Sequence, residues 1–274
     1  MKNWSWFFII IPMVFLGCLQ TETKILLQKD GSGIIEQQVL VRKDIVEMMQ
    51  QMQAALQGSL PPQTTSSGVY NEGKLKEDAS RMGQGVRFVQ SRPVTTPAGE
   101  GYQVRYAFTD INTLQVPETP LPEDTILQQP GGLETNSGRV SFQFTKGNPA
   151  TLRVFTRKLE HQRQKDSKAE EEGKEDEEAE SEEDKAMVQE LLRDMKVSLK
   201  IEVSGTITST NADFRSGNQV TILNLDFNSI FENPEALEIL MQNKINSLEE
   251  LKAFSRRYPG LQMETKEQIQ IQFR

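Results

Sequence analysis

The only cysteine of the 274-residue chain, Cys18, comes directly after a short apolar stretch that runs from Phe7 to Leu16. A basic residue, Lys2, precedes the stretch, and this order is the pattern of a signal peptide over residues 1–17. As a helix the stretch would be about 15 Å long, whereas crossing a bilayer takes roughly 20 residues. The pattern therefore predicts export rather than a permanent membrane span. Because no cysteine follows Cys18, the exported part has to fold by packing alone, without disulfides.

The residues around Cys18 resemble the lipobox of bacterial lipoproteins, with the small residue Gly17 before the thiol. In that family the cysteine accepts a diacylglycerol, the chain is cut on its amino side, and the new terminus is acylated, as with palmitate. More than one acyl chain gives stable anchoring. The resemblance implies lipidation at Cys18, with residues 18–22 as a lipidated tether. Phe15 stands where the pattern usually has Leu, so an ordinary secretory signal and an uncleaved anchor remain alternatives.

Leu19, the residue after the cysteine, bears on which membrane holds the anchor. In Gram-negative relatives of the lipoprotein pattern, an Asp at this position is the usual signal for retention in the inner membrane. We therefore expect a cell-envelope lipoprotein outside the cytoplasm, in the outer membrane if the organism has one.

The negative charge of the chain is concentrated in one segment. Of a formal net charge of −8 for the whole chain, residues 166–184 contribute −10, from twelve acidic residues and two lysines. The rest is nearly neutral, which argues against nucleic-acid binding because that requires a basic surface. We interpret residues 159–185 as a disordered or solvated helical acidic segment that serves as a spacer, with docking of a basic partner as the alternative.

Alternating and helical patterns follow one another along the chain as hairpins and helices in series. Strands are expected at 23–27, 34–41, 86–89, 102–108, 140–144, 152–154, 197–203, 220–225 and 268–273. Helices are expected at 43–56, 74–82, 187–195, 233–243 and 247–258. The expected fold class is α+β, a mainly antiparallel sheet built from hairpins and packed with several amphipathic helices. The expected organisation is a single α+β domain whose first part spans 23–158 and whose remainder spans 186–274, on either side of the acidic segment.

Two groups of turn and strand residues resemble LppM-like bacterial lipoproteins. The first is the hairpin turn at 29–33 with a helix behind it, and the second is the strand pair that contains 203–207, 211–213 and 217–221. Gly31, Gly33 and Gly217 stand where a tight turn is expected to require positive φ. The resemblance implies an envelope lipoprotein with an α+β domain and contact with lipid or envelope glycan.

No motif for catalysis, a metal or a cofactor is found in the sequence. His161 is the only histidine and lies in a polar stretch without a nucleophile or an orienting partner nearby. With one histidine and no mature cysteine, a zinc site is excluded. The turn 30–33 lacks the Lys of a phosphate-binding loop. We therefore expect no enzyme, no metal and no cofactor.

The methionines Met48, Met49 and Met52 form a flexible apolar stripe on the expected helix 43–56. Such stripes can adapt to apolar ligands, although ordinary core packing explains them too. We interpret the chain as a non-enzymatic envelope lipoprotein that binds a lipid-like ligand or an envelope protein, with these methionines as candidate ligand contacts. The alternatives are a scaffold that recruits a basic partner through the acidic segment and, third, an enzyme of unfamiliar type.

Overall fold

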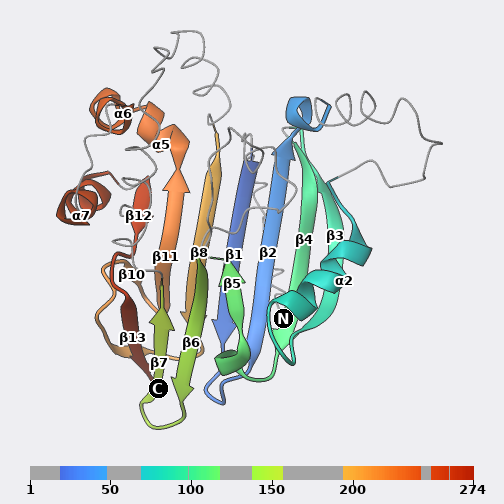
Figure 1. Cartoon of the computed structure of the whole chain (residues 1–274), viewed down its shortest axis with the longest axis vertical. Helices are drawn as coiled ribbons and strands as arrows, with labels where there is room; N and C mark the ends of the chain where they lie inside the picture. Colours follow the sequence, from blue (N-terminus) through green and yellow to red (C-terminus); the bar gives the residue numbers. More distant parts are fainter. Residues whose placement is uncertain are drawn as a thin grey trace, which may run out of the picture.

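The computed structural model describes residues 19–47, 69–97, 99–117, 138–156, 194–241, 248–258 and 260–274. These residues form two β-sheets, sheet A and sheet B, with short helices beside them (Figure 1). Buried apolar side chains of both sheets belong to one continuous cluster, so the sheets are the two layers of one core.

Sheet A has eight strands in the order β10-β11-β8-β1-β2-β4-β3, and β12 also pairs with β11. The central strand β1 pairs antiparallel with β2 on one side and parallel with β8 on the other. The remaining pairs are antiparallel, which makes the sheet mixed. The strands are β1 Leu19–Leu27, β2 Gly33–Arg42, β3 Arg87–Thr95, β4 Gly99–Phe108, β8 Lys196–Val203, β10 Arg215–Ser216, β11 Gln219–Asp226 and β12 Leu261–Met263.

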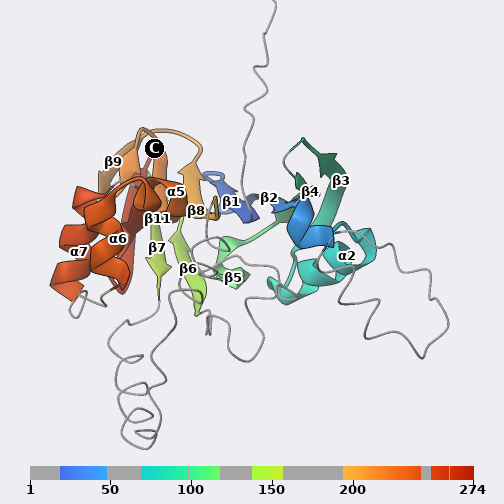
Figure 2. The same cartoon turned by 90° about the horizontal axis from the view of Figure 1, so that it is seen from above.

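Sheet B has five antiparallel strands in the order β5-β6-β7-β13-β9. They are β5 Gln115–Pro117, β6 Arg139–Thr145, β7 Ala150–Phe155, β9 Ile207–Thr210 and β13 Gln268–Phe273. Seen from above, β5, β6 and β7 lie on one side of sheet A (Figure 2). The turn between β1 and β2 touches this layer, because a Cβ on Gly31 would lie 2.8 Å from the ring of Phe144.

The helices are short and lie at the margins of the sheets. The segment 43–47 is helical directly after β2, and the helix α2 lies beside β3 and β4. The side chain of Asn71 caps α2 by accepting a hydrogen bond from the backbone N–H of Lys74 at 3.1 Å. The bounds of the helices are α2 Glu72–Arg81, η1 Ile111–Thr113, α5 Phe227–Phe231, α6 Pro234–Met241 and α7 Leu248–Arg257.

Side chains of β1 alternate between the core and the outer face of sheet A. Ile25 and Leu27 are fully buried between the sheets. On the outer face, Glu22 pairs with Lys200 at 2.8 Å, which links β1 to β8. The alternation is that of a sheet with one face packed and the other in water.

The predicted fold class, α+β with several amphipathic helices packed on the sheet, is wrong. Strands dominate the described residues, and a second sheet covers sheet A where a helical layer was expected. The longest described helices have ten residues, and α2 buries only Leu75 and Ala79. Alternation of apolar and polar residues identifies strands but does not tell which sheet each strand joins. The sequence therefore predicts one sheet where the structure has two.

Candidate functional site

The residues that the sequence singles out lie outside the described part of the chain. They are the lipidation site Cys18, the candidate ligand contacts Met48, Met49 and Met52, and the only histidine, His161. The acidic segment, residues 159–185, lies outside it as well, so its two suggested roles stay predictions. A candidate site therefore has to be built from other residues.

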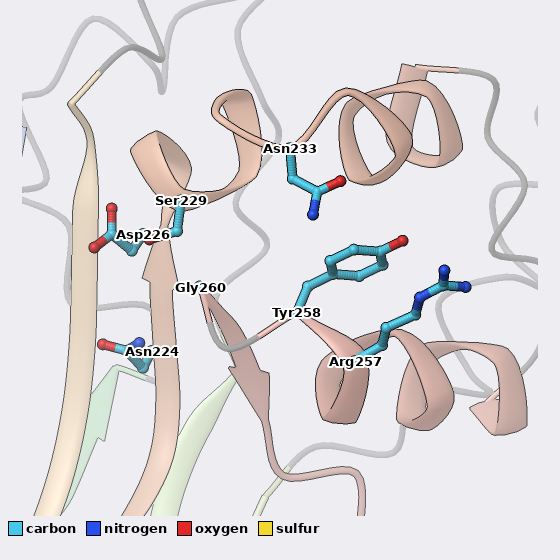
Figure 3. Close-up of a pocket in the computed structure, with 7 residues that line it drawn as sticks. All are labelled: Asn224, Asp226, Ser229, Asn233, Arg257, Tyr258 and Gly260. Carbon is cyan, nitrogen blue, oxygen red and sulfur yellow. The ribbon is translucent and has the colours of Figure 1, made fainter.

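A polar hollow of about 260 Å³ lies beside the end of β11, between that strand and the helices α5 and α7 (Figure 3). We refer to it as the β11 hollow. Two separate segments of the chain line it, residues 224–233 and 257–260, and nearly all of the lining side chains are polar. The lining residues are Asn224 and Asp226 of β11, Ser229 of α5, Asn233 after α5, and Arg257, Tyr258 and Gly260 at the end of α7.

Backbone contacts hold these segments together. The N–H of Asp226 donates to the carbonyl of Gly260 at 2.6 Å, and the N–H of Phe227 donates to the carbonyl of Met195 at 3.0 Å. A Cβ at Gly260 would lie 2.6 Å from the Cβ of Ser229, so only glycine allows the turn to approach α5 this closely. The shape of the hollow is therefore set by backbone rather than by adjustable side chains.

The strand side of the β11 hollow carries a paired carboxylate. Asp226 Oδ2 lies 2.9 Å from Lys196 Nζ on β8. The other oxygen, Oδ1, is buried and has no hydrogen-bond partner within the described part of the chain. In Figure 3 the side chains of Asp226 and Asn224 extend toward β8, away from α7. They offer acceptors at one end of the hollow only.

The helix side carries a paired cation and a buried phenol. Arg257 Nη2 lies 2.8 Å from Glu235 Oε2, and the guanidinium lies 5.4 Å from the centre of the Tyr258 ring. Tyr258 is 5% exposed, and its hydroxyl has no hydrogen-bond partner among the described residues. Burial raises the pKa of Tyr258. The phenol therefore stays neutral, and its hydroxyl group is buried.

The chemistry that the β11 hollow supports is recognition by hydrogen bonds. Each charged side chain in it is already paired with an opposite charge, so the local charge is balanced. Across the described ranges, no group of three or more His, Cys, Asp or Glu side chains could hold a metal ion. In the same part of the chain, no helix has both the length and the apolar character needed to cross a membrane.

The pairing register places the β11 hollow at the end of sheet A where β1 begins. Asp226 pairs with Lys196 of β8, and Lys196 pairs with Gln20 of β1. Two strand spacings separate Asp226 from Gln20, or about 10 Å. In the sequence, Cys18 stands two residues before Gln20. The β11 hollow and the start of β1 therefore lie at the same end of sheet A.

A second polar cluster joins the loop after β9 to the segment between β12 and β13. The fully buried carboxylate of Glu264 accepts hydrogen bonds through Oε1 from the backbone N–H groups of Asp213 and Phe214, the latter at 3.1 Å. Its Oε2 lies 3.7 Å from Lys266 Nζ. Burial raises the pKa of Glu264. Burial also acts to raise the pKa of Asp213, but contacts with Lys266 and Arg256 outweigh it and lower that pKa. These contacts attach the loop after β9 to the segment between β12 and β13, so the role of the cluster is structural.

Comparison with known proteins gives a weak likeness in fold. No protein-family model matches the chain, and no curated protein matches it. Among solved structures, the chain is similar to the folded domain of the Mycobacterium tuberculosis LppM protein, at 12% sequence identity and a TM-score of 0.29. The match covers 82% of this chain and 88% of that one. The LppM-like resemblance expected from the sequence is supported only to this extent, and no function follows from it.

Sequence reasoning missed the residues of the β11 hollow. Asp226 and Tyr258 were read only as the end of a strand and the end of a helix. The available signal was local: the turn 258–260 brings an aromatic residue, a proline and a glycine together directly after a helix. Nothing in the sequence shows that this turn lies against the end of β11.

Proposed function

We propose that this chain is a non-enzymatic lipoprotein of the bacterial cell envelope, anchored through lipid on Cys18, whose folded domain binds a lipid-like ligand or an envelope protein. The observation that carries the proposal is the position of β1. This strand begins at Leu19, the residue after Cys18, although the sequence pattern placed the first strand at Thr23. The residue that directly follows the predicted lipidation site thus already belongs to a paired strand of the folded domain.

The pairing of β1 strengthens this proposal. Leu19 pairs with Val41 of β2 and Gln20 pairs with Lys196 of β8, so the strand is held on both sides from its first residues. Leu19 is 4% exposed, as expected for a residue that belongs to the core. A long helix continuing from residues 1–17 into this strand would have to break here. Cleavage before Cys18 leaves one residue ahead of the sheet.

The choice of ligand rests on two features at the same end of the domain. The helical segment 43–47 begins there, with Val46 buried and Ile45 packed against the core, and the stripe of Met48, Met49 and Met52 follows it in sequence. The β11 hollow adds hydrogen-bonding groups. A methionine-rich sequence after this buried segment, together with the polar groups of the β11 hollow, suits an amphipathic, lipid-like ligand better than a purely polar one.

The anchor is tested by replacing Cys18 with Ser in the full chain. The expected result is loss of palmitate labelling and retention of the uncleaved precursor, while the parent chain is labelled and shortened. Ser5→Ala, another change in the predicted signal peptide, serves as the control and should leave labelling intact. A Cys18→Ser chain that is still acylated and cut would refute the lipobox assignment.

The ligand is tested by native mass spectrometry of the full chain released from its own membranes in mild detergent. We expect a co-purifying lipid in the parent chain and reduced retention when Met48, Met49 and Met52 are all changed to Gln. The exchange keeps side-chain length and removes the apolar surface. A lipid retained equally by both chains would move the ligand site elsewhere, and the absence of any bound lipid would favour an envelope protein as the partner.

A further inference from the structure

We propose that the end of sheet A at which β1 begins rests directly against the lipid headgroups, so that the strands of sheet A stand upright on the membrane. The proposal rests on lipidation at Cys18 and specifies which surface of the domain meets the bilayer. The surface consists of the first residues of β1 and β8, the last residues of β2 and β11, the segment 43–47 and the helix α5.

The short distance between Cys18 and Leu19 determines which end of sheet A lies nearest to the proposed anchor. Consecutive Cα atoms are about 3.8 Å apart, so the lipid-bearing residue lies one residue step from Leu19. Leu19 itself is fixed in the centre of an eight-stranded sheet. The opposite end of β1 is nine residues, and therefore about 30 Å, away from the lipid. That end cannot rest on the headgroups beside the anchor.

Strand directions decide which elements share this end. Because β8 runs parallel to β1, and β2 and β11 run antiparallel to their neighbours, the starts of β1 and β8 coincide with the ends of β2 and β11. Figure 1 shows this common end at the top, with α5 and α6 beside it, while the turns between β1 and β2 and between β6 and β7 lie at the bottom.

The chemistry of this end fits headgroups and not the hydrocarbon interior. Val89 of β3 is the exposed large hydrophobic residue in the described part of the chain, and it lies on the outermost strand of sheet A, away from β1. The end near β1 instead carries the ion pairs Arg42–Asp44 at 2.6 Å and Lys196–Asp226 at 2.9 Å. Paired charges stay better hydrated in the polar headgroup layer than in the hydrocarbon interior. The headgroup layer is about 5–8 Å thick on each side of the hydrocarbon.

The charge at this end narrows the lipid surface further. Exposed side chains of both signs lie there: the carboxylates of Glu47 and Glu232 and the ammonium group of Lys43. This nearly balanced charge suits a surface of zwitterionic headgroups and gives little attraction to anionic lipids. The β11 hollow lies at the same end, so an upright domain holds its hydrogen-bonding groups next to the headgroup layer.

The orientation is tested with single fluorescent labels on the full lipidated chain in phosphatidylcholine vesicles that carry a nitroxide on the headgroup. Lipidation consumes the thiol of Cys18, so an introduced cysteine is the one free thiol. Lys43→Cys and Ser229→Cys mark the two sides of the proposed contact, and Lys146→Cys in the turn after β6 marks the far end; all three residues are exposed. We expect several-fold stronger quenching at positions 43 and 229 than at position 146.

A linker variant separates orientation from anchoring. Ten Gly and Ser residues inserted between Cys18 and Leu19 would extend the tether by about 17 Å and let the domain turn freely. The difference between the three labels should then shrink, although the chain stays on the vesicles. Equal quenching at all three positions in the original chain, or quenching at 146 alone, would overturn the upright orientation. A chain that does not bind vesicles would instead count against lipidation at Cys18.

Discussion

Replacing Glu264 by Ala removes the acceptor that two backbone N–H groups share, those of Asp213 and Phe214. A buried donor left without a partner costs roughly 1–3 kcal/mol, and less where water can reach it. Both donors are partly buried, so about 1 kcal/mol each, or about 2 kcal/mol in total, is the expected loss in the free energy of unfolding. The loop after β9 should lose its attachment first.

Glu264→Gln is the matched variant, because the amide keeps an acceptor oxygen but cannot ionise. The free energy of unfolding should fall by less than about 1 kcal/mol at pH 5. The raised pKa of Glu264 means that the folded chain holds the proton more tightly than the unfolded chain, whose value is near 4.5. The stability that comes from this proton is complete below pH 4.5 and is lost as the pH rises through the folded-state pKa. The Gln variant should therefore gain stability relative to the parent as the pH rises.

Urea unfolding of the three purified chains at pH 4, 5, 7 and 8 measures these differences directly. Asp213 has a lowered pKa, so its stabilising contribution is present above about pH 3.8 and is lost as the pH falls through the folded-state pKa. Because all three chains keep Asp213, they are compared chiefly between pH 5 and 8. If Gln destabilises the chain as much as Ala at every pH, the acceptor role of Glu264 is wrong. If the difference between Gln and the parent does not change with pH, the carboxyl is not held protonated by burial.

Two further substitutions test the packing of the fold. Gly31→Ala should lower the free energy of unfolding by about 1–3 kcal/mol, since Gly31 has φ +92° and a Cβ would press on Phe144. Gly217→Ala is the control and should lower it by less, because Gly217 has φ +60° and nothing within 4 Å of the added Cβ. Equal losses in the two variants would show that the Phe144 contact is unimportant. Tyr258→Phe should leave the melting temperature unchanged or slightly raised in the absence of ligand, because it removes a buried hydroxyl that has no partner among the described residues; a clear decrease would reveal a hydrogen bond to that hydroxyl.

The hairpins could be predicted because their signals are local. The turn at 28–32 joins two strands whose side chains alternate, and the observed register pairs Leu27 with Gly33 across it. The helix α6 begins at Pro234 as expected, because a cap residue followed by proline is a start signal that needs no tertiary contact. Where the alternation of side chains and the turn signal lie within one short stretch, the sequence alone is sufficient to predict the element.

The missed features depend on contacts between distant segments. The first strand was expected to begin at Thr23, whereas β1 already includes Leu19. Gln20 and Thr21 are only 8% and 2% exposed, and an apolar pattern does not identify buried polar residues of this kind. The strand β3 extends to Thr95, beyond the expected 86–89, and includes Pro93; proline is tolerated there because β3 is an edge strand. The β11 hollow needs the turn at Gly260 to meet Asp226, and no local pattern encodes that meeting.

The parallel pairing of β1 with β8 has a consequence for the export that we propose. Glu22 and Lys200 form an ion pair across 178 residues of sequence, so the centre of sheet A closes only when residues up to 203 are available. Contacts of such long sequence separation form slowly. On the proposed route, β1 would emerge and pair with β2 before β8 could join it, and lipidation at Cys18 would precede the closure of sheet A.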